Sequence, residues 1–218
     1  LDSGQQPISE RAGARVLLGN GEIYNYLELR RTIDDYPYQT QGDMEAVLAA
    51  AHRYGDDFVD HLNGMYALAL YDGEVHRLSL VRDRLGVKPL YWAKIKGGGI
   101  AFASEIKALF ATGLVDRDID EGAVDAYLAH GYVPSPGPLF ANVHKLPPAH
   151  RLSIDGSGAI VIERYWMPRA DASLPTDAEE VRRHLLDLLD DSVRLQLRSD
   201  VAVGALLSGG IDSGLLVA

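Results

Sequence analysis

The stretch MYALALYD at residues 65–72, followed by Gly73-Glu74 and then VHRLSLVRD at residues 75–83, decides the fold class of this chain. Both runs are apolar and partly alternating, which is typical of β-strands with a buried side. The Asp72-Gly73-Glu74 sequence between them is typical of a turn, and strands joined by so short a turn pair in antiparallel fashion. The stretch therefore predicts a β-hairpin.

The sequence on both sides repeats this pattern. Two more hairpins are predicted, one over residues 90–103 around Gly97-Gly98-Gly99 and one over residues 151–163 around the DGSG at 155–158. RVLLG at residues 15–19 predicts a further strand. Helical spacing or helix-forming composition marks residues 22–33, 43–54, 105–112 and 121–131. Neighbouring hairpins with helices between them predict an α+β domain built from antiparallel sheets.

The pattern changes after residue 165. Residues 166–177 (WMPRADASLPTD) are polar, contain two prolines and predict a linker. Residues 178–198 place apolar side chains on one face of a helix, and VAVGALL at 201–207 is typical of a strand buried in a parallel sheet. We therefore expect one domain over residues 1–165, a linker over 166–177, and the start of a doubly wound α/β domain over 178–218.

Composition narrows the classes of partner. The 218 residues hold 21 Lys and Arg against 31 Asp and Glu, a formal net charge of −10, so nucleic acid is not an expected partner. No apolar run is long enough to span a membrane and no leader pattern opens the chain, so we expect a cytoplasmic protein without a membrane partner. Cysteine is absent and the seven His are scattered, which argues against a disulfide framework and a zinc site.

Two motifs in the first part place polar residues beside glycine. Asn20-Gly21-Glu22 follows a predicted strand, and the local interpretation is a tight turn with Glu22 at the start of a helix. Gly42-Asp43 precedes the second predicted helix, where Asp43 is typical of an N-cap that accepts hydrogen bonds from the first turn. Taken alone, neither motif requires a function.

A third motif, SGGIDS at residues 208–213, follows the predicted buried strand and opens a helix. Adjacent glycines let backbone N–H groups converge on an anion, and the helix N-terminus and the two serine hydroxyls add to the attraction. GxxxxGK[ST] is absent, so this is not a Walker loop. The alternative is a plain glycine turn. The preceding strand and the following Asp212-Ser213 favour a loop that binds phosphate or pyrophosphate.

Longer segments support a resemblance to a known family. NGEIYNY at 20–26, LNGMYA at 62–67, RDRLGVKPLY at 82–91 and ASEIKAL at 103–109 resemble glutamine-hydrolysing asparagine synthetases, and SGGIDS resembles the pyrophosphate loop of ATP-pyrophosphatases. The resemblance covers nearly the whole chain. It implies a class II glutamine amidotransferase domain, which is an N-terminal-nucleophile type sandwich of antiparallel sheets with outer helices, before an ATP-dependent ligase domain. We interpret the charges in RDRLGVKPLY as structural, pairing and capping within a bend.

The resemblance also implies roles for single residues. Asn20 and Gly21 match the oxyanion hole for glutamine hydrolysis, while Glu22 and Asp43 match contacts of the glutamine α-ammonium. Asp212 is a candidate Mg²⁺ ligand. The implied substrates are glutamine, aspartate and ATP, the implied products are asparagine, glutamate, AMP and pyrophosphate, and a homodimer is left open. The implied ATP-binding residues are Leu207, Ser208, Gly209, Gly210, Ile211, Asp212 and Ser213.

The sequence departs from that family at the nucleophile. The family uses an N-terminal cysteine, whereas this chain starts at Leu1, contains no Cys and stops at Ala218 inside an apolar segment. We therefore expect a fragment of a longer enzyme, without glutaminase activity of its own. Two alternatives stay open: a β-lactam-synthetase-like or other amide-forming relative with another acceptor, and a catalytically silent glutamine-binding module. The retained NGE and GD motifs favour truncation.

Overall fold

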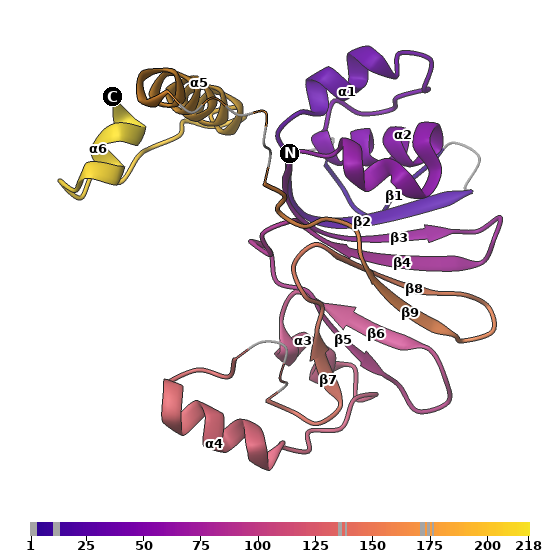
Figure 1. Ribbon diagram of the computed structural model, residues 1–218. Helices are drawn as coiled ribbons and strands as arrows, with labels where there is room; N and C mark the ends of the chain where they lie inside the picture. Colours follow the sequence, from indigo (N-terminus) through magenta and orange to yellow (C-terminus); the bar gives the residue numbers. More distant parts are fainter. Residues whose placement is uncertain are drawn as a thin grey trace. The chain divides into compact units, whose positions relative to one another are not determined.

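A computed structural model describes residues 4–10, 14–134, 137, 139–170, 173, 175 and 177–218. The chain divides into two compact units, Leu1–Met167 and Pro168–Ala218, which are described separately below. All strands of the described residues lie in the first unit, and the second unit contains two helices (Figure 1).

A six-stranded antiparallel sheet is the larger of the two sheets in the first unit (Figure 1). The hairpin predicted from residues 65–83 is confirmed as β3 and β4, with Ala67 opposite Arg82 and Asp72 opposite Arg77. The hairpin predicted around DGSG is confirmed as β8 and β9. In spatial order the strands are β1 (Ile8–Ser9), β2 (Arg15–Ile23), β3 (Gly64–Asp72), β4 (Arg77–Arg82), β8 (His150–Ile154) and β9 (Ile160–Arg164).

A three-stranded antiparallel sheet lies against one face of the larger one. It contains the remaining predicted hairpin, β5 (Tyr91–Lys94) and β6 (Ile100–Ala103), with β7 (Val143–Lys145) on the other side of β5. Ala67 and Ala69 of β3 pack against Trp92 of β5 in the core between the sheets. The small side chains on β3 leave room for the indole ring, so the two sheets can approach closely.

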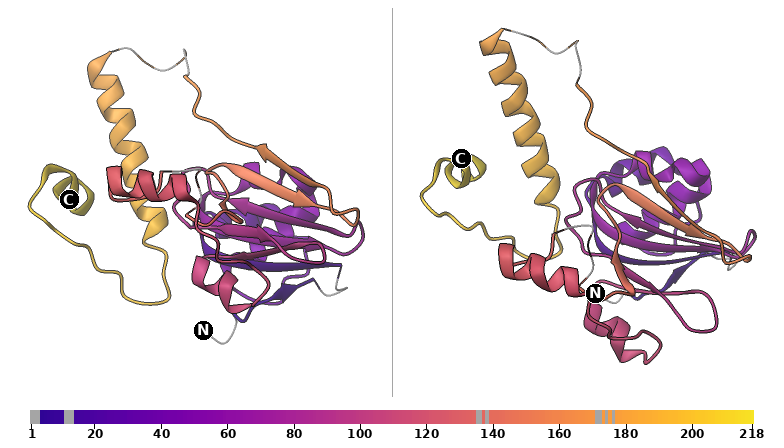
Figure 2. Two further views of the ribbon diagram at one scale, coloured as in Figure 1. Left: turned by 90° about the horizontal axis from the view of Figure 1, so that it is seen from below. Right: turned by 60° about the horizontal axis from the view of Figure 1, so that its bottom comes forward.

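Alternation along β3 places its larger side chains on the opposite face. Tyr66, Leu68 and Leu70 pack there against the buried residues of α2, because successive side chains of a strand point to opposite sides of the sheet. The helical segments on this face are α1 (Tyr26–Thr32), α2 (Asp43–Tyr54) and the 3₁₀ segment η1 (Gly55–His61). Figure 2 shows α1 and α2 on one side of the six-stranded sheet and the second sheet on the other.

The outer face of the small sheet is covered in turn. Ala93 and Val143 pack against Leu109 of helix α3 (Ile106–Ala111). Helix α4 (Glu121–His130) begins after Asp120, whose side chain accepts a hydrogen bond from the Ala123 N–H at 2.9 Å. The first unit is thus layered helix, sheet, sheet, helix, which confirms the predicted sandwich of antiparallel sheets with outer helices.

The bend between β4 and β5 is held by two buried charged residues. Asp83 is only 1% exposed, and its carboxylate accepts hydrogen bonds from four backbone N–H groups, those of Tyr66, Leu85, Val87 and Lys88. The Arg82 guanidinium donates to three carbonyls, those of Gly86, Lys88 and Leu146. Buried charges are stable only when they are satisfied in this way. The interpretation of these charges as structural is confirmed.

Two predicted boundaries are wrong around β2. The strand does not end before Asn20 but continues to Ile23, with Asn20 opposite Ala67 and Gly21 opposite Tyr66. The local interpretation of Asn-Gly as a turn is therefore wrong, and α1 begins at Tyr26 rather than at residue 22. Pairing with the whole length of β3 outweighs the local turn preference of the dipeptide.

The second unit contains α5 (Ala178–Gln196), which confirms the predicted amphipathic helix, and α6 (Ile211–Val217). The Asp177 side chain caps α5 by accepting from the Glu180 N–H at 3.0 Å. The predicted buried strand at residues 201–207 is wrong: the segment has no strand structure, and Leu206 is 97% exposed. A strand needs a hydrogen-bonded neighbour, and none of the described strands pairs with this segment.

Candidate functional site

The free edge of β2 begins where β1 ends. β1 pairs with β2 only as far as Leu17 opposite Ile8, so the backbone groups of Gly19, Gly21 and Ile23 extend beyond it. The Gln6 side chain takes the place of a strand at Gly19, where its Oε1 accepts from the N–H at 2.6 Å and its Nε2 donates to the carbonyl at 2.8 Å. The Asp43 carboxylate accepts from the Ile23 N–H at 2.8 Å.

Gly21 lies between these two satisfied positions. Its partner Tyr66 directs its N–H and C=O away from β2, to the carboxylate and N–H of Asp83. Gly21 and Tyr66 therefore form a non-hydrogen-bonded pair, and the Gly21 N–H faces the open edge of β2, because hydrogen bonding alternates along antiparallel strands. A Cβ at Gly21 would lie 2.0 Å from the Met65 carbonyl oxygen. Glycine is required here by close approach of two strands rather than by a turn.

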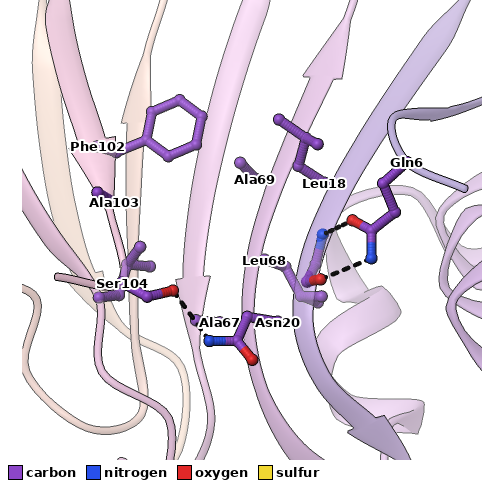
Figure 3. Close-up of a pocket in the computed structure, with 11 residues that line it drawn as sticks. Gln6, Leu18, Asn20, Ala67, Leu68, Ala69, Phe102, Ala103 and Ser104 are labelled. Atoms are coloured by element: carbon purple, nitrogen blue, oxygen red, sulfur yellow. Dashed lines mark hydrogen bonds between the residues drawn. The ribbon is translucent and has the colours of Figure 1, made fainter. Parts of the chain in front are cut away.

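The Asn20 side chain projects from β2 toward the second sheet. Its Nδ2 donates to Ser104 Oγ at 3.0 Å, and Ser104 directly follows β6 (Figure 3). The two residues line a pocket of about 190 Å³. Its other lining residues are Gln6, Leu18, Gly19, Ala67, Leu68, Ala69, Leu90, Phe102 and Ala103. Asn20 is exposed, so a ligand in the pocket can reach its amide.

Glu22 and Asp43 form a pair of like charges next to this pocket. Burial raises the pKa of Glu22, the neighbouring Asp43 carboxylate raises it further, and the Lys88 ammonium partly offsets both effects. Two carboxylates brought together repel each other and attract a cation. The site is therefore suited to a positively charged group such as an ammonium ion.

Asp43 does not have the capping role predicted for it. The N-cap of α2 is Gly42, whereas the Asp43 carboxylate bonds to Ile23 on the neighbouring strand. The loop before it is fixed by Glu45, which is 1% exposed and accepts from the N–H groups of Gln39 and Thr40, both at 2.7 Å. This arrangement orients the first turn of α2 toward β2.

Sequence reasoning found Asn20, Gly21, Glu22 and Asp43, and the structure brings them to one end of β2. It missed four residues around them: Gln6 and Glu45 bond to the strand and the loop that carry them, Ser104 bonds to the Asn20 side chain, and the Lys88 ammonium lowers the raised pKa of Glu22. Ser104 and Lys88 lie in the quoted segments ASEIKAL and RDRLGVKPLY, which were the available signals. The sequence distance from Asn20 to Ser104 is 84 residues, so no local pattern connects them.

The second candidate site, SGGIDS, forms a turn into α6. Gly209 has a positive φ of 79°, Gly210 is the N-cap, and the hydroxyl oxygens of Ser208 and Ser213 lie 2.9 Å apart. Gly209 therefore needs to be glycine for its backbone conformation. Ile211 is 90% exposed. Leu207 and Asp212 are exposed as well, so every predicted residue of this loop except the half-buried Ser213 is open to solvent.

The loop offers one carboxylate that could bind a magnesium ion, so it could supply only part of the ion's coordination. Within the described ranges no three His, Asp or Glu side chains gather into a metal site. Mg²⁺ at phosphate sites needs only one or two carboxylates together with phosphate oxygens and water. Asp212 would supply one such carboxylate, next to the serine hydroxyls.

Comparison with known proteins adds the family context. Residues 1–166 match the family model of a glutamine amidotransferase domain, and residues 184–218 match that of asparagine synthase. Asparagine synthetase [glutamine-hydrolyzing] 1 of Bacillus subtilis is 35% identical over 100% of this chain and 34% of its own length. A putative asparagine synthetase of Mycobacterium tuberculosis is 43% identical over 93% of this chain and 32% of its own length. The chain thus spans about a third of the length of these relatives.

Solved structures resemble the chain in fold. Glutamine phosphoribosylpyrophosphate amidotransferase from B. subtilis aligns with a TM-score of 0.55 at 18% identity, covering 97% of this chain and 46% of its own. An allosteric regulatory enzyme of purine biosynthesis aligns with a TM-score of 0.57, also at 18% identity, covering 98% and 45%. Among the described helices, none is long and apolar enough to cross a membrane.

Proposed function

Because this chain belongs to the family of glutamine amidotransferase domains and continues into the start of an asparagine synthase domain, we propose that it works within a longer enzyme that makes asparagine. That enzyme takes nitrogen from glutamine and uses ATP to transfer it to aspartate. The observation that carries the proposal is the end of β2, where Asn20 and Gly21 present N–H donors beside the carboxylates of Glu22 and Asp43.

Charge and hydrogen bonding at this edge suit glutamine. The α-ammonium of the substrate meets Glu22 and Asp43, and its positive charge relieves the repulsion between them. Asp43 uses one oxygen for the Ile23 N–H and keeps the other for the ligand. The side-chain amide of glutamine then extends toward Asn20 and Gly21.

The two donors act on the reaction rather than on binding. When a nucleophile adds to the amide carbon of glutamine, the carbonyl oxygen becomes negative, and N–H groups of Asn20 and Gly21 stabilise that charge. The C–N bond then breaks, the proton given up by the attacking thiol passes to the departing nitrogen so that ammonia leaves, and water releases glutamate from the nucleophile. The family resemblance supplies that nucleophile as a cysteine, which this chain lacks. We assign this half of the reaction to residues 1–165.

ATP chemistry belongs to the domain that starts at residue 178, after a linker at 166–177. The aspartate β-carboxylate attacks the α-phosphorus of ATP, pyrophosphate leaves, and ammonia then displaces AMP to form the amide. Residues 207–213 would bind the phosphates through N–H and hydroxyl donors, and Asp212 would supply a carboxylate to a Mg²⁺ that offsets their charge. We expect the enzyme to act in the cytoplasm, where ATP and glutamine are abundant. Whether the enzyme forms a homodimer is tested by measuring its molecular mass in solution.

The test uses the complete enzyme with each nitrogen source in turn. Asn20→Ala removes one oxyanion donor, so we expect glutamine-dependent kcat to fall roughly 10²–10³-fold. Synthesis from aspartate, ATP and ammonia stays at the wild-type rate, because the variant leaves the other domain intact. Unchanged glutamine-dependent kcat contradicts the proposal.

A second candidate is a catalytically silent glutamine-binding module, because a pair of carboxylates attracts an α-ammonium whether or not a nucleophile acts beside it. The same preparation separates the candidates through its products. Glutamate release identifies an active amidotransferase, whereas calorimetric binding of glutamine without glutamate release identifies the silent module. Pyrophosphate formation that depends on a carboxylate other than aspartate identifies a relative with another acceptor.

A further inference from the structure

The hydrogen bond between Asn20 and Ser104 joins the two sheets at the glutamine pocket. Asn20 lies on β2 of the larger sheet, and Ser104 lies between β6 of the smaller sheet and α3. The bond is 3.0 Å long and runs from Asn20 Nδ2 to Ser104 Oγ (Figure 3). β2 and β6 belong to different sheets, and among the described residues no backbone hydrogen bond is recorded between them.

A primary amide has two N–H groups and one oxygen, and rotation about the last side-chain bond exchanges their directions at little cost. The Ser104 hydroxyl accepts one N–H of Asn20 and so fixes the plane of the amide. It also determines which end faces the pocket. With the opposite orientation, the Asn20 oxygen would face the negative charge that develops on the substrate.

Ser104 is well supported for this role. Ala103 directly before it is paired with Tyr91 across β5 and β6, and Glu105 directly after it is the N-cap of α3. Secondary structure on both sides fixes the backbone at Ser104. On the other side of the pocket the Gln6 amide fixes Gly19 through two bonds, so the strand that carries Asn20 is also fixed.

A nucleophilic role for Ser104 does not fit its surroundings. A serine hydroxyl attacks only when a neighbouring base takes its proton. The pocket lining, taken over the described residues, contains no His, Lys, Asp or Glu. Ser104 therefore acts through Asn20 and not on the substrate carbon.

We propose that Ser104 is a positioning residue for glutamine hydrolysis, holding one N–H of Asn20 so that the other faces the oxyanion. This rests on the proposed function. The experiment is a double-mutant cycle in the complete enzyme, with Asn20→Ala, Ser104→Ala and both together. We expect Ser104→Ala alone to lower glutamine-dependent kcat roughly 10–100-fold, less than the loss of the donor itself, with KM for glutamine within about twofold.

The effect of Ser104→Ala in an enzyme that already carries Asn20→Ala distinguishes positioning of Asn20 from an independent effect of Ser104. In the Asn20→Ala enzyme, Ser104→Ala should change kcat by less than about twofold, because no amide is left to orient. Ser104→Thr keeps the hydroxyl and should restore most of the activity. Ser153→Ala on β8, outside the pocket, is the matched control and should leave kcat unchanged. Ammonia-dependent synthesis reports whether damage extends to the other domain and should stay at the wild-type rate in every variant.

The failures are distinguishable. If Asn20→Ala leaves glutamine-dependent kcat unchanged, the oxyanion hole of the proposed function is wrong. If Asn20→Ala lowers kcat and Ser104→Ala lowers it by the same factor in both backgrounds, positioning by Ser104 is wrong. A parallel loss of ammonia-dependent synthesis in Ser104→Ala also contradicts positioning, because it shows general damage to the fold.

Discussion

Glu22 lies near Asp43 at a cost in stability, and the ammonium of the proposed ligand would offset that cost. Burial and the neighbouring Asp43 raise the pKa of Glu22, which means that its ionised form is disfavoured in the folded protein. Only Lys88 opposes this effect among the causes of the shift. Sites built for a ligand commonly store such unfavourable contacts. Substituting each carboxylate in turn can therefore separate its effect on glutamine binding from its effect on the stability of the fold.

Asp43→Asn in the complete enzyme should raise KM for glutamine by about 10–150-fold. Asparagine still accepts the Ile23 N–H but loses the charge opposite the ammonium, a cost of about 1.5–3 kcal/mol for a charged hydrogen bond. Steady-state kinetics with glutamine and with ammonia are the measurement, and ammonia-dependent synthesis should not change. The matched control is Asp120→Asn at the N-cap of α4. If KM for glutamine is unaltered in Asp43→Asn, the role of Asp43 is only its hydrogen bond with Ile23 and not binding of the substrate.

Glu22→Gln should raise KM for glutamine and also raise the melting temperature at pH 7 by roughly 1–3 °C. The sign follows from the pKa of Glu22, which is raised from its ordinary 4.5 in the folded protein. Ionised Glu22 therefore costs stability above the raised pKa. The cost disappears as the pH falls below 4.5, where folded and unfolded forms are both protonated.

Thermal scans of both proteins between pH 4 and pH 8 measure the effect. The difference in melting temperature between variant and wild type should shrink to zero at the acid end. In wild type, KM for glutamine should rise as the pH falls through the raised pKa. A variant that is less stable than wild type at pH 7 rules out the carboxylate repulsion.

At the scale of elements, β2 is the organising strand of the site. Its edge is occupied by Gln6 at Gly19 and by Asp43 at Ile23, while Gly21 between them is left for a ligand. The bend after β4 helps to keep the Gly21 N–H available. Asp83 in this bend bonds to both the N–H and the C=O of Tyr66, the residue opposite Gly21 on β3. The buried Asp83 carboxylate and two strands thus define the position of the Gly21 N–H group.

Gly21→Ala should destabilise the chain by about 1–3 kcal/mol or more, because the new methyl group meets the backbone of β3 and the strands must move apart. Urea unfolding followed by circular dichroism is the measurement. Gly156→Ala in the β8–β9 turn is the control, since its nearest neighbour lies at 3.9 Å. Equal unfolding midpoints for both variants would show that β2 and β3 tolerate separation.

At the scale of the whole molecule, we propose different chemistries for the two units. Glutamine hydrolysis is proposed for the first unit, Leu1–Met167, and ATP binding for the second, Pro168–Ala218. The second unit exposes many apolar side chains, including Leu206 and Ile211. We expect these to be buried by further structure in the complete enzyme, because isolated apolar segments of this length favour aggregation.

Gly209→Val in the complete enzyme should abolish synthesis with both nitrogen sources. Valine is strained at a φ of 79° and its branched side chain blocks the approach of phosphate to the backbone. Gly210→Val tests the space alone, since Gly210 has a φ of −80°, and should have a smaller effect. Pyrophosphate formation and glutamate release are measured in one preparation, and glutamate release should persist. Synthesis that survives in Gly209→Val would identify SGGIDS as a plain turn.

The sequence by itself determined the elements whose signals are local. The β3–β4 hairpin, the two other hairpins and α2 at Asp43–Tyr54 were predicted from alternation, turn residues and helical composition. Each signal lies within about twenty residues, so no distant partner had to be known. The family resemblance of their motifs also pointed to the four residues that we propose bind glutamine, and the structure brings these four together.

Only the tertiary structure decided what those residues do for one another. Asn20-Gly21 lies in a strand because β3 pairs along its whole length, and Asp43 bonds to Ile23 instead of capping α2. Ser104 meets Asn20 across 84 residues. Conversely, residues 201–207 have strand composition but form no strand, because none of the described strands pairs with them. Hydrogen bonds between distant segments depend on where the whole chain places them, and no local pattern encodes that placement.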